Sequence, residues 1–143
     1  MDWWYLLTGF EGRISRKPYW IALLAVVAVE IAAHVVAYQI EGDRLSAIVD
    51  LAFSYPEFAI LAKRGHDRDI PTWIPGLFFA ISVLLDFLTV IGLGGTRDQP
   101  STLALVIALP WMAFGLALLA DLGLRRGTVG PNRYGPDPLD PGA

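Results

Sequence analysis

The side chains best suited to chemistry fall into two sets. In the first, His66 and Asp67 are neighbours in a polar, basic stretch. An imidazole beside a carboxylate is typical of proton-transfer pairs and of metal sites. The chain has one other histidine, His34, and no cysteine, so few partners exist for a catalytic or metal centre. We therefore expect a protein that is not an enzyme and uses no metal or cofactor; an enzyme would have to be built on His66 and Asp67.

The second set consists of ionisable residues inside long apolar stretches: Glu30, His34, Asp50 and Asp86. Glu30 and His34 are four residues apart, which places them on one helix face. At about 1.5 Å per residue, His34, Asp50 and Asp86 fall at similar depths in a bilayer, and Glu30 falls one turn deeper. Such groups are costly in hydrocarbon, so they normally face the bundle interior, pair or stay protonated. This predicted intramembrane cluster is either a hydrogen-bonded structural group or a site for protons, cations or a metal ion.

Two further carboxylates lie near the ends of apolar stretches. Asp121 precedes Arg125 by four residues, which predicts an ion pair on a helix surface. Glu57 is expected to reach Lys63, Arg64 or water.

Membrane-spanning helices must position these residues. Of the 143 residues, 55% are hydrophobic and 17% are charged, and the mean hydropathy is +0.49. A soluble domain of this size cannot bury so much apolar surface. We predict an all-α integral membrane protein with a single membrane domain over residues 1–143 and four transmembrane helices, each needing about 20 mostly apolar residues. The predicted spans cover residues 19–40, 45–62, 73–93 and 102–124, and a tail follows over residues 125–143.

A short aromatic-rich segment, residues 3–10, precedes the first span. It is typical of an interfacial segment lying on the membrane surface, although it can also pack beneath the bundle. The first span is too long for the apolar core of a signal peptide, so we expect it to be retained.

The distribution of positive charge predicts the orientation. Of the 11 Lys and Arg residues, all except Arg44 and Arg97 lie in the amino-terminal stretch, the middle connection or the tail. Because Lys and Arg favour the cytoplasmic side, we expect both termini and the middle connection to be cytoplasmic.

Three stretches on that side carry a specific pattern. Residues 10–20 read FEGRISRKPYW, residues 63–67 read KRGHD and lead to Trp73, and residues 127–138 read GTVGPNRYGPDP. In this order they resemble the bacterial inner-membrane "domain of unknown function 805" family. Lys63 and Gly65 stand where the family usually has Arg and Leu, and Thr72 replaces a small residue. The resemblance implies a bacterial inner (plasma) membrane protein and brings no established activity.

These stretches have three alternative roles. In the first, arginines pair with Asp67, Asp69 and Asp137 and join the connections into a cytoplasmic cap. In the second, the arginines contact the phosphates of anionic lipid headgroups. In the third, His66 and Asp67 form the catalytic or metal pair considered above. The candidate residues are Arg13, Arg16, Arg64, His66, Asp67, Trp73, Asn132 and Arg133.

We expect a non-enzymatic interaction or envelope-associated module whose cap is its working surface. One alternative is a small proton or cation transport or conduction protein that uses the intramembrane carboxylates, and another is an anionic-lipid binding protein. The predicted partners are the lipid bilayer, anionic lipid, and either a second copy of the chain or another membrane protein. The net charge of −3 argues against nucleic acid as a partner.

Overall fold

The computed structural model describes residues 2–96 and 98–140, so Met1, Arg97 and the last three residues of the predicted tail lie outside the described residues. The described residues form five helices and no strand, which confirms the all-α prediction. The helices are α1 (Trp3–Leu7), α2 (Arg16–Glu41), α3 (Asp43–Asp67), α4 (Trp73–Val90) and α5 (Thr102–Leu124).

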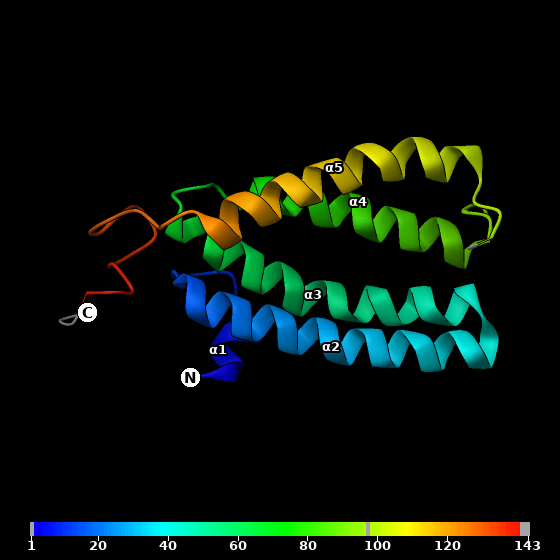
Figure 1. Cartoon of the computed structure of the whole chain (residues 1–143), viewed down its shortest axis with the longest axis horizontal. Helices are drawn as coiled ribbons and strands as arrows, with labels where there is room; N and C mark the ends of the chain where they lie inside the picture. The colour runs from blue at the N-terminus through cyan, green and yellow to red at the C-terminus, as the bar shows by residue number, and fades with distance from the viewer. Residues whose placement is uncertain (1, 97, 141–143) are drawn as a thin grey trace.

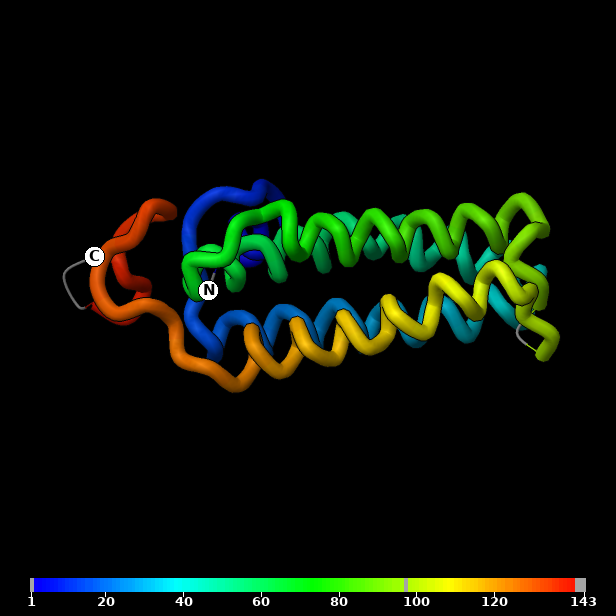
Figure 2. Tube along the Cα trace, turned by 90° about the horizontal axis from the view of Figure 1, so that it is seen from above, coloured from blue at the N-terminus to red at the C-terminus, as the bar shows by residue number. Residues whose placement is uncertain are grey.

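The four long helices form two antiparallel hairpins that lie along one axis. Helices α2 and α3 make the first hairpin, and α4 and α5 make the second (Figure 1). In the view turned by 90°, α2 and α5 lie on one side of the molecule and α3 and α4 on the other (Figure 2). We call the end where α2 and α4 begin the basic end, and the opposite end the far end.

The surface of the bundle is that of a membrane protein. Each of the four long helices is long and apolar enough to cross a membrane. On α5, Leu103, Val106 and Leu109 are each more than half exposed. A continuous apolar surface of this kind is stable in contact with lipid and not in contact with water. The chain is therefore an integral membrane protein with four membrane-capable helices.

Helix α3 extends beyond the predicted span and includes Lys63–Asp67, which were expected to form a loop. This expectation was wrong because polarity alone suggested a connection. The side chains of Lys63, Arg64 and Asp67 are instead buried against segments that are distant in the sequence. The helix ends at Asp67 with Arg68 as its C-cap, and the N–H of Ile70 then donates to the carbonyl oxygen of Gly65.

The turn between α2 and α3 consists of Gly42 alone. Its φ of 71° lies in the left-handed region that glycine adopts without steric cost. The N–H of Gly42 donates to Tyr38 O, and the carbonyl of Gly42 accepts from Ser46 N. This tight reversal holds the first hairpin together at the far end.

The densest packing lies toward the basic end. There the buried side chains of Tyr19, Ala22, Ile60 and Leu122 join α2, α3 and α5. Helix α1 packs onto the same core through Leu6, which is 2% exposed. Toward the far end the two hairpins are held less closely, and cavities lie between them.

Candidate functional site

The cap at the basic end, formed by residues 8–15, 63–72 and 125–140, is centred on Asp67. Arg13 approaches this carboxylate from the amino-terminal segment, with its Nη2 at 3.1 Å and its Nε at 3.3 Å from Oδ1. Arg64, one turn earlier on α3, donates from Nη1 to Asp67 Oδ2. All three side chains are at least 96% buried, so the predicted pairing of arginines with Asp67 takes place inside the protein.

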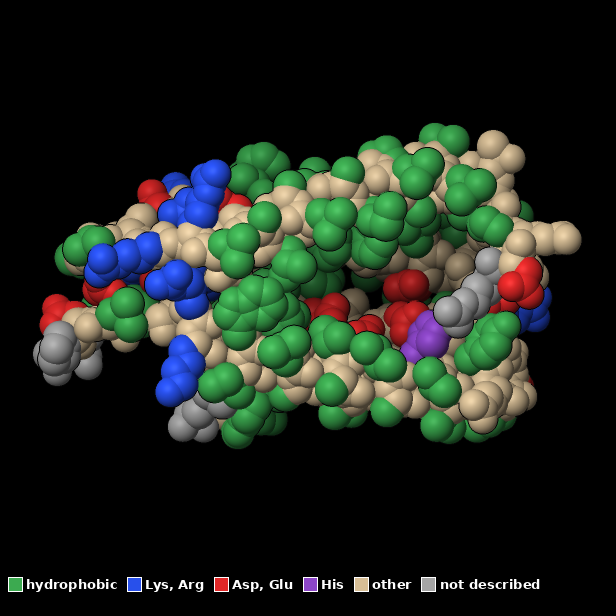
Figure 3. Space-filling model, in the orientation of Figure 1, with side chains coloured by type: hydrophobic (Ala, Val, Ile, Leu, Met, Phe, Trp, Pro, Cys, Tyr) green, Lys and Arg blue, Asp and Glu red, His purple; other side chains and the backbone are tan. Residues whose placement is uncertain are grey.

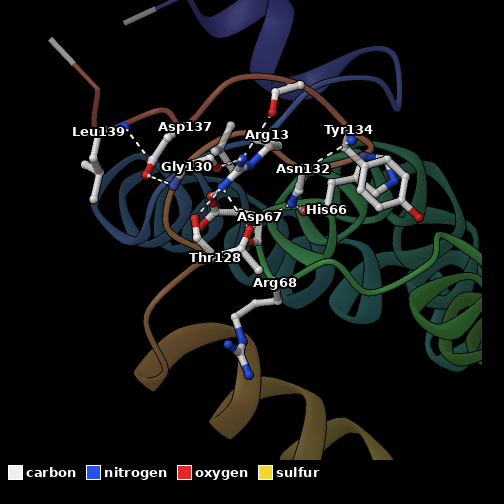
Figure 4. A network of polar contacts seen from close by, with 12 residues as sticks. Arg13, His66, Asp67, Arg68, Thr128, Gly130, Asn132, Tyr134, Asp137 and Leu139 are labelled. Atoms are coloured by element: carbon white, nitrogen blue, oxygen red, sulfur yellow. Dashed lines mark hydrogen bonds and ion pairs between the residues drawn. The ribbon is translucent and has the colours of Figure 1, made fainter.

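Arg13 also ties the first segment of the chain to the last. Its Nη1 donates to the carbonyl oxygens of Gly130 at 2.9 Å and Gly135 at 3.1 Å, and its Nη2 donates to Thr128 O at 2.8 Å (Figure 4). Each nitrogen of this guanidinium therefore has a protein acceptor. The arrangement leaves Arg13 no free donor for a headgroup phosphate.

Arg64 fixes the end of α5. Its Nε donates to Leu122 O and its Nη2 to Arg125 O, both at 2.6 Å. Leu122 lies in the last turn of α5 and Arg125 directly follows the helix, a region where helix geometry leaves carbonyls without backbone partners. Arg64 thus joins α3 to α5 and is fully buried, which makes it a structural residue rather than a lipid ligand.

Lys63 anchors α1, a role that the sequence did not indicate. Its Nζ donates to the carbonyl oxygens of Tyr5 at 2.7 Å, Gly9 at 2.9 Å and Thr8 at 3.1 Å. The charged group therefore accommodates the orphan carbonyls at the end of this short helix. A signal did exist, because Lys63 follows directly after an apolar stretch and one turn of α3 places it among buried residues.

His66 makes its hydrogen bonds away from Asp67, which gives no support to the alternative of a proton-transfer pair. Its Nδ1 lies 3.0 Å from Gly12 O and its Nε2 lies 2.7 Å from the hydroxyl of Thr72. The ring stacks on Tyr134 at a centroid distance of 3.8 Å (Figure 4). Successive helix residues point in different directions, and both ring nitrogens already have partners. His66 therefore packs the tail onto the bundle.

The tail is held through its polar turns. Asn132 Nδ2 donates to His66 O and to Thr128 Oγ1, both at 2.8 Å. Asp137 was expected to pair with an arginine, but its carboxylate accepts instead from the N–H groups of Leu139 and Gly130. These two hydrogen bonds hold the pKa of Asp137 below its usual value.

Exposed ion pairs surround the buried network. Arg133 pairs with Asp69 at 3.0 Å, as predicted. Asp121 accepts from Arg125 at 3.1 Å, as expected, and also from Arg68 at 3.2 Å. Exposed pairs of this kind contribute less than about 1 kcal/mol each.

Arg16 and Trp73 lie at the edge of the cap. Arg16 was expected to bind a carboxylate, but its Nη1 donates to Leu124 O at 3.2 Å because α2 begins beside the end of α5. Trp73 opens α4 and is 67% exposed. It lies at the edge of the basic end, where interfacial tryptophans are common.

The intramembrane carboxylates form the second candidate site. A cavity of about 380 Å³ between the hairpins is lined by Glu30 of α2, Asp50 and Glu57 of α3 and Asp86 of α4. His34 joins this group through its Nδ1, which lies 2.8 Å from Asp50 Oδ1. The space-filling view shows a hollow between α5 and α2 with carboxylates and a histidine at its edge (Figure 3). The structure therefore brings together all four residues of the predicted cluster.

Glu57 was missed as a member of this cluster. It was expected to reach Lys63, Arg64 or water, but the side chains of Lys63 and Arg64 point into the cap. Glu57 follows Asp50 by seven residues, which is two helical turns, so both occupy one face of α3. That spacing was the available signal. No group of three His or carboxylate side chains within residues 2–96 and 98–140 is placed to hold a metal ion.

Comparisons with known proteins decide the family. Residues 7–136 match the family described as Protein of unknown function (DUF805). The chain belongs to this family. The DUF805 match runs from the end of α1 into the tail, so it includes both the cap and the carboxylate cavity. It confirms the resemblance found in the sequence.

Curated relatives of this DUF805 chain come from Escherichia coli (strain K12). The Inner membrane protein YhaH is 25% identical over 152 aligned positions, which cover 99% of this chain and 100% of YhaH. The Inner membrane protein YhaI is 28% identical, with 94% of each chain covered. The Uncharacterized protein YiiR is also 28% identical, with 94% of this chain and 88% of YiiR covered. No solved structure gives a significant match.

Proposed function

We propose that this DUF805 protein is a non-enzymatic inner-membrane protein that binds protons or small cations at the carboxylates between its hairpins. The cap closes the basic end in this conformation and has to open for a proton or cation to cross the membrane. The basic end with both termini faces the cytoplasm. The observation that carries this proposal is the convergence of Glu30, Asp50, Glu57 and Asp86 from three helices on one cavity.

The charge balance of the cavity supports proton or cation binding. Among the described residues that line it, the ionisable side chains are all carboxylates, and His34 is the adjacent base. Carboxylates that lack a Lys or Arg partner in a low-dielectric site must hold protons or attract cations. Ser54 and Ser82 add neutral hydroxyl groups to the same wall.

The position of a neighbouring cavity supports access from the far end. A cavity of about 320 Å³ is lined by His34, Asp43, Asp50, Asp86 and Thr89. It shares Asp50 and Asp86 with the first cavity, and Asp43 is the first residue of α3. A polar path therefore leads from the far end into the middle of the bundle.

The buried cap supports closure at the opposite end. Asp67 and the two buried arginines join segments from both hairpins, and their side chains are almost inaccessible. A fixed network of charge-assisted hydrogen bonds is rigid and excludes water. Docking of a partner on the cap and self-association of the bundle remain predictions.

Proton flux into liposomes tests the proposal. The double variant Glu30→Gln plus Asp86→Asn removes two of the cavity carboxylates with little change in shape. We expect the wild-type protein to raise the flux reported by an internal pH-sensitive dye and the double variant to lose that increase. The matched control is Asp69→Asn, which neutralises a carboxylate outside the cavity and should conduct like wild type. Equal flux for wild type and the double variant would contradict the proposal.

A further inference from the structure

An apolar cavity of about 270 Å³ continues from the acidic cavity toward the basic end. The two cavities share Glu57, Phe78, Phe79 and Trp111. In the apolar cavity the other lining residues are mainly aliphatic, and Glu57 is its one charged residue among those described. The bundle therefore contains one crevice that is acidic near the middle and apolar near the cap.

Tyr19, one of the residues that line this apolar cavity, carries an unsatisfied polar atom. The residue lines the cavity and is 0% exposed, and within residues 2–96 and 98–140 its hydroxyl has no hydrogen-bond partner. Native proteins rarely leave a buried hydroxyl unpaired. Arg64 and Glu57 are the charged groups that interact with it electrostatically. Arg64 is occupied by the cap, and Glu57 shares a hydrogen bond with Glu30. A ligand in this cavity therefore meets an unpaired hydroxyl and a carboxylate that already has one partner.

The aromatic wall of the cavity is rigid. The rings of Phe78 and Trp111 are stacked, with centroids 5.1 Å apart and an interplanar angle of 8°. Trp111 Nε1 donates to Ser82 Oγ at 3.0 Å and to Phe78 O at 3.2 Å, which fixes the indole. Gly115 faces the ring of Phe78, and a Cβ at this position would collide with that ring. A residue without a side chain is therefore needed here for Phe78 to occupy its place in the wall.

We infer that this cavity binds a lipophilic primary amine, with the ammonium group between Glu57 and the Tyr19 hydroxyl and an aryl or alkyl body along Phe78 and Trp111. The inference rests on the proposed function, because Glu57 belongs to both cavities. An ammonium has several N–H donors, so it can serve the carboxylate and the phenolic oxygen together. Charge pairing is strong in this low-dielectric setting, and the aromatic faces also attract a cation.

Other ligand classes fit these surroundings less well. Anions are repelled by Glu57 and the neighbouring carboxylates. Small hydrated metal cations gain nothing from an apolar wall. An amphiphile partitions into the bilayer and can enter from the lipid through the hollow between α2 and α5 (Figure 3).

The experiment uses the full chain in nanodiscs and isothermal titration calorimetry, with empty nanodiscs as the blank. The probes are 4-phenylbutylamine and its neutral analogue 4-phenyl-1-butanol. On wild-type protein we expect the amine to bind at least about tenfold more tightly than the alcohol, because hydrogen bonds to charged groups are strong. This comparison needs no variant. Equal binding of the two probes, or no binding of either, would overturn the inference.

Variants then locate the amine. Glu57→Gln should abolish the preference for the amine, and Tyr19→Phe should weaken amine binding about tenfold. Tyr55→Phe is the matched control on an exposed tyrosine of α3 and should bind like wild type. Unchanged amine binding by Tyr19→Phe would mean that the Tyr19 hydroxyl does not contact the amine and has water as its hydrogen-bond partner. That result would also overturn the inference.

The two proposals fail in different ways. Tyr19→Phe should retain the proton flux of wild type, because Tyr19 lies outside the acidic cavity. If the double variant loses proton flux while Tyr19→Phe binds the amine like wild type, only the amine site is wrong. If the variants change amine binding as expected while the double variant conducts protons like wild type, only the proposed function is wrong.

Discussion

Asp67 has the most consequential side chain at the scale of single residues. It neutralises part of the charge of two buried guanidinium groups, from Arg13 and Arg64, that belong to different segments. Its backbone carbonyl also accepts from Thr128 N at 2.7 Å. One residue thus connects the amino-terminal segment, α3 and the tail.

Asp67→Asn should strongly destabilise the protein. The change keeps the shape but leaves two buried cations without a counter-charge, which costs about 3–5 kcal/mol. We expect a large drop in the midpoint of thermal unfolding in detergent, followed by circular dichroism. Asp69→Asn is the control, since its pair with Arg133 is exposed and is worth less than about 1 kcal/mol. Similar losses for both variants would refute a buried role for Asp67.

Gly127→Ala should destabilise the cap. A Cβ at Gly127 would collide with the carboxylate of Asp67, which cannot move because Arg13 and Arg64 hold it. We expect a loss of about 1–3 kcal/mol in the free energy of unfolding, measured by denaturant titration.

Gly65→Ala is the matched control for that change. A Cβ there meets its nearest atom, Ile70 O, at 3.7 Å, which is an ordinary contact. Since alanine is favoured over glycine inside a helix by about 0.5–1 kcal/mol, this variant should be neutral or more stable. A stable Gly127→Ala protein would show that the tail does not pack against Asp67.

At the scale of elements, α5 packs closely against α2 at the basic end. Gly123 lies under the indole of Trp20, and Trp20 Nε1 donates to Gly123 O at 3.1 Å. Small residues allow helices to approach closely in membranes, where lipid supplies no hydrophobic drive for association.

Gly123→Ala should loosen α5 from α2. The added Cβ would meet the Trp20 ring at 2.5 Å, and a ring held by its own hydrogen bond cannot yield easily. We expect about 1–3 kcal/mol of destabilisation, seen as a lower melting midpoint. Gly76→Ala, whose Cβ would touch Phe58 at 3.5 Å, should melt like wild type. If both variants melt alike, the contact between Trp20 and Gly123 does not hold the helices.

The four long helices were predictable from the pattern of apolar residues. The ends of a helix were predictable only where the apolar stretch and the helix end at the same residue. The end of α3 shows the limit. Lys63–Asp67 read as a polar connection, yet they stay helical because α1, α5 and the tail satisfy their side chains. These partners lie far along the chain, and no local pattern reports them.

The same distinction applies to the candidate sites. Residue types suggested that arginines pair with Asp67, and the structure shows that its partners are Arg13 and Arg64. They could not predict which direction His66 faces, because that depends on the stacking of Tyr134 from the tail. The carboxylate cluster followed from depth along the helices, whereas the membership of Glu57 required knowledge of which face of α3 points inward.

At the scale of the whole molecule, the basic end gathers both termini and the connection between α3 and α4 (Figure 1). Because the chain has no cysteine, single cysteines can report topology without background. Leu139→Cys marks the tail and Asp98→Cys marks the far end, and both positions are exposed.

We expect Leu139→Cys to resist a membrane-impermeant maleimide in intact cells and Asp98→Cys to react. This follows from the positive-inside rule. After permeabilisation both cysteines should be labelled, which controls for accessibility. The reverse labelling pattern would place the basic end outside and would invert the direction of the proposed cation path.

The contacts of Arg13 also have a consequence for biosynthesis. Arg13 is synthesised 115 to 122 residues before its carbonyl acceptors at Thr128, Gly130 and Gly135. Until these acceptors have been made, its guanidinium has to remain hydrated or pair transiently. A chain that stops before Thr128 would still insert its apolar helices, but Arg13 would lack these acceptors and the basic end would stay open to water.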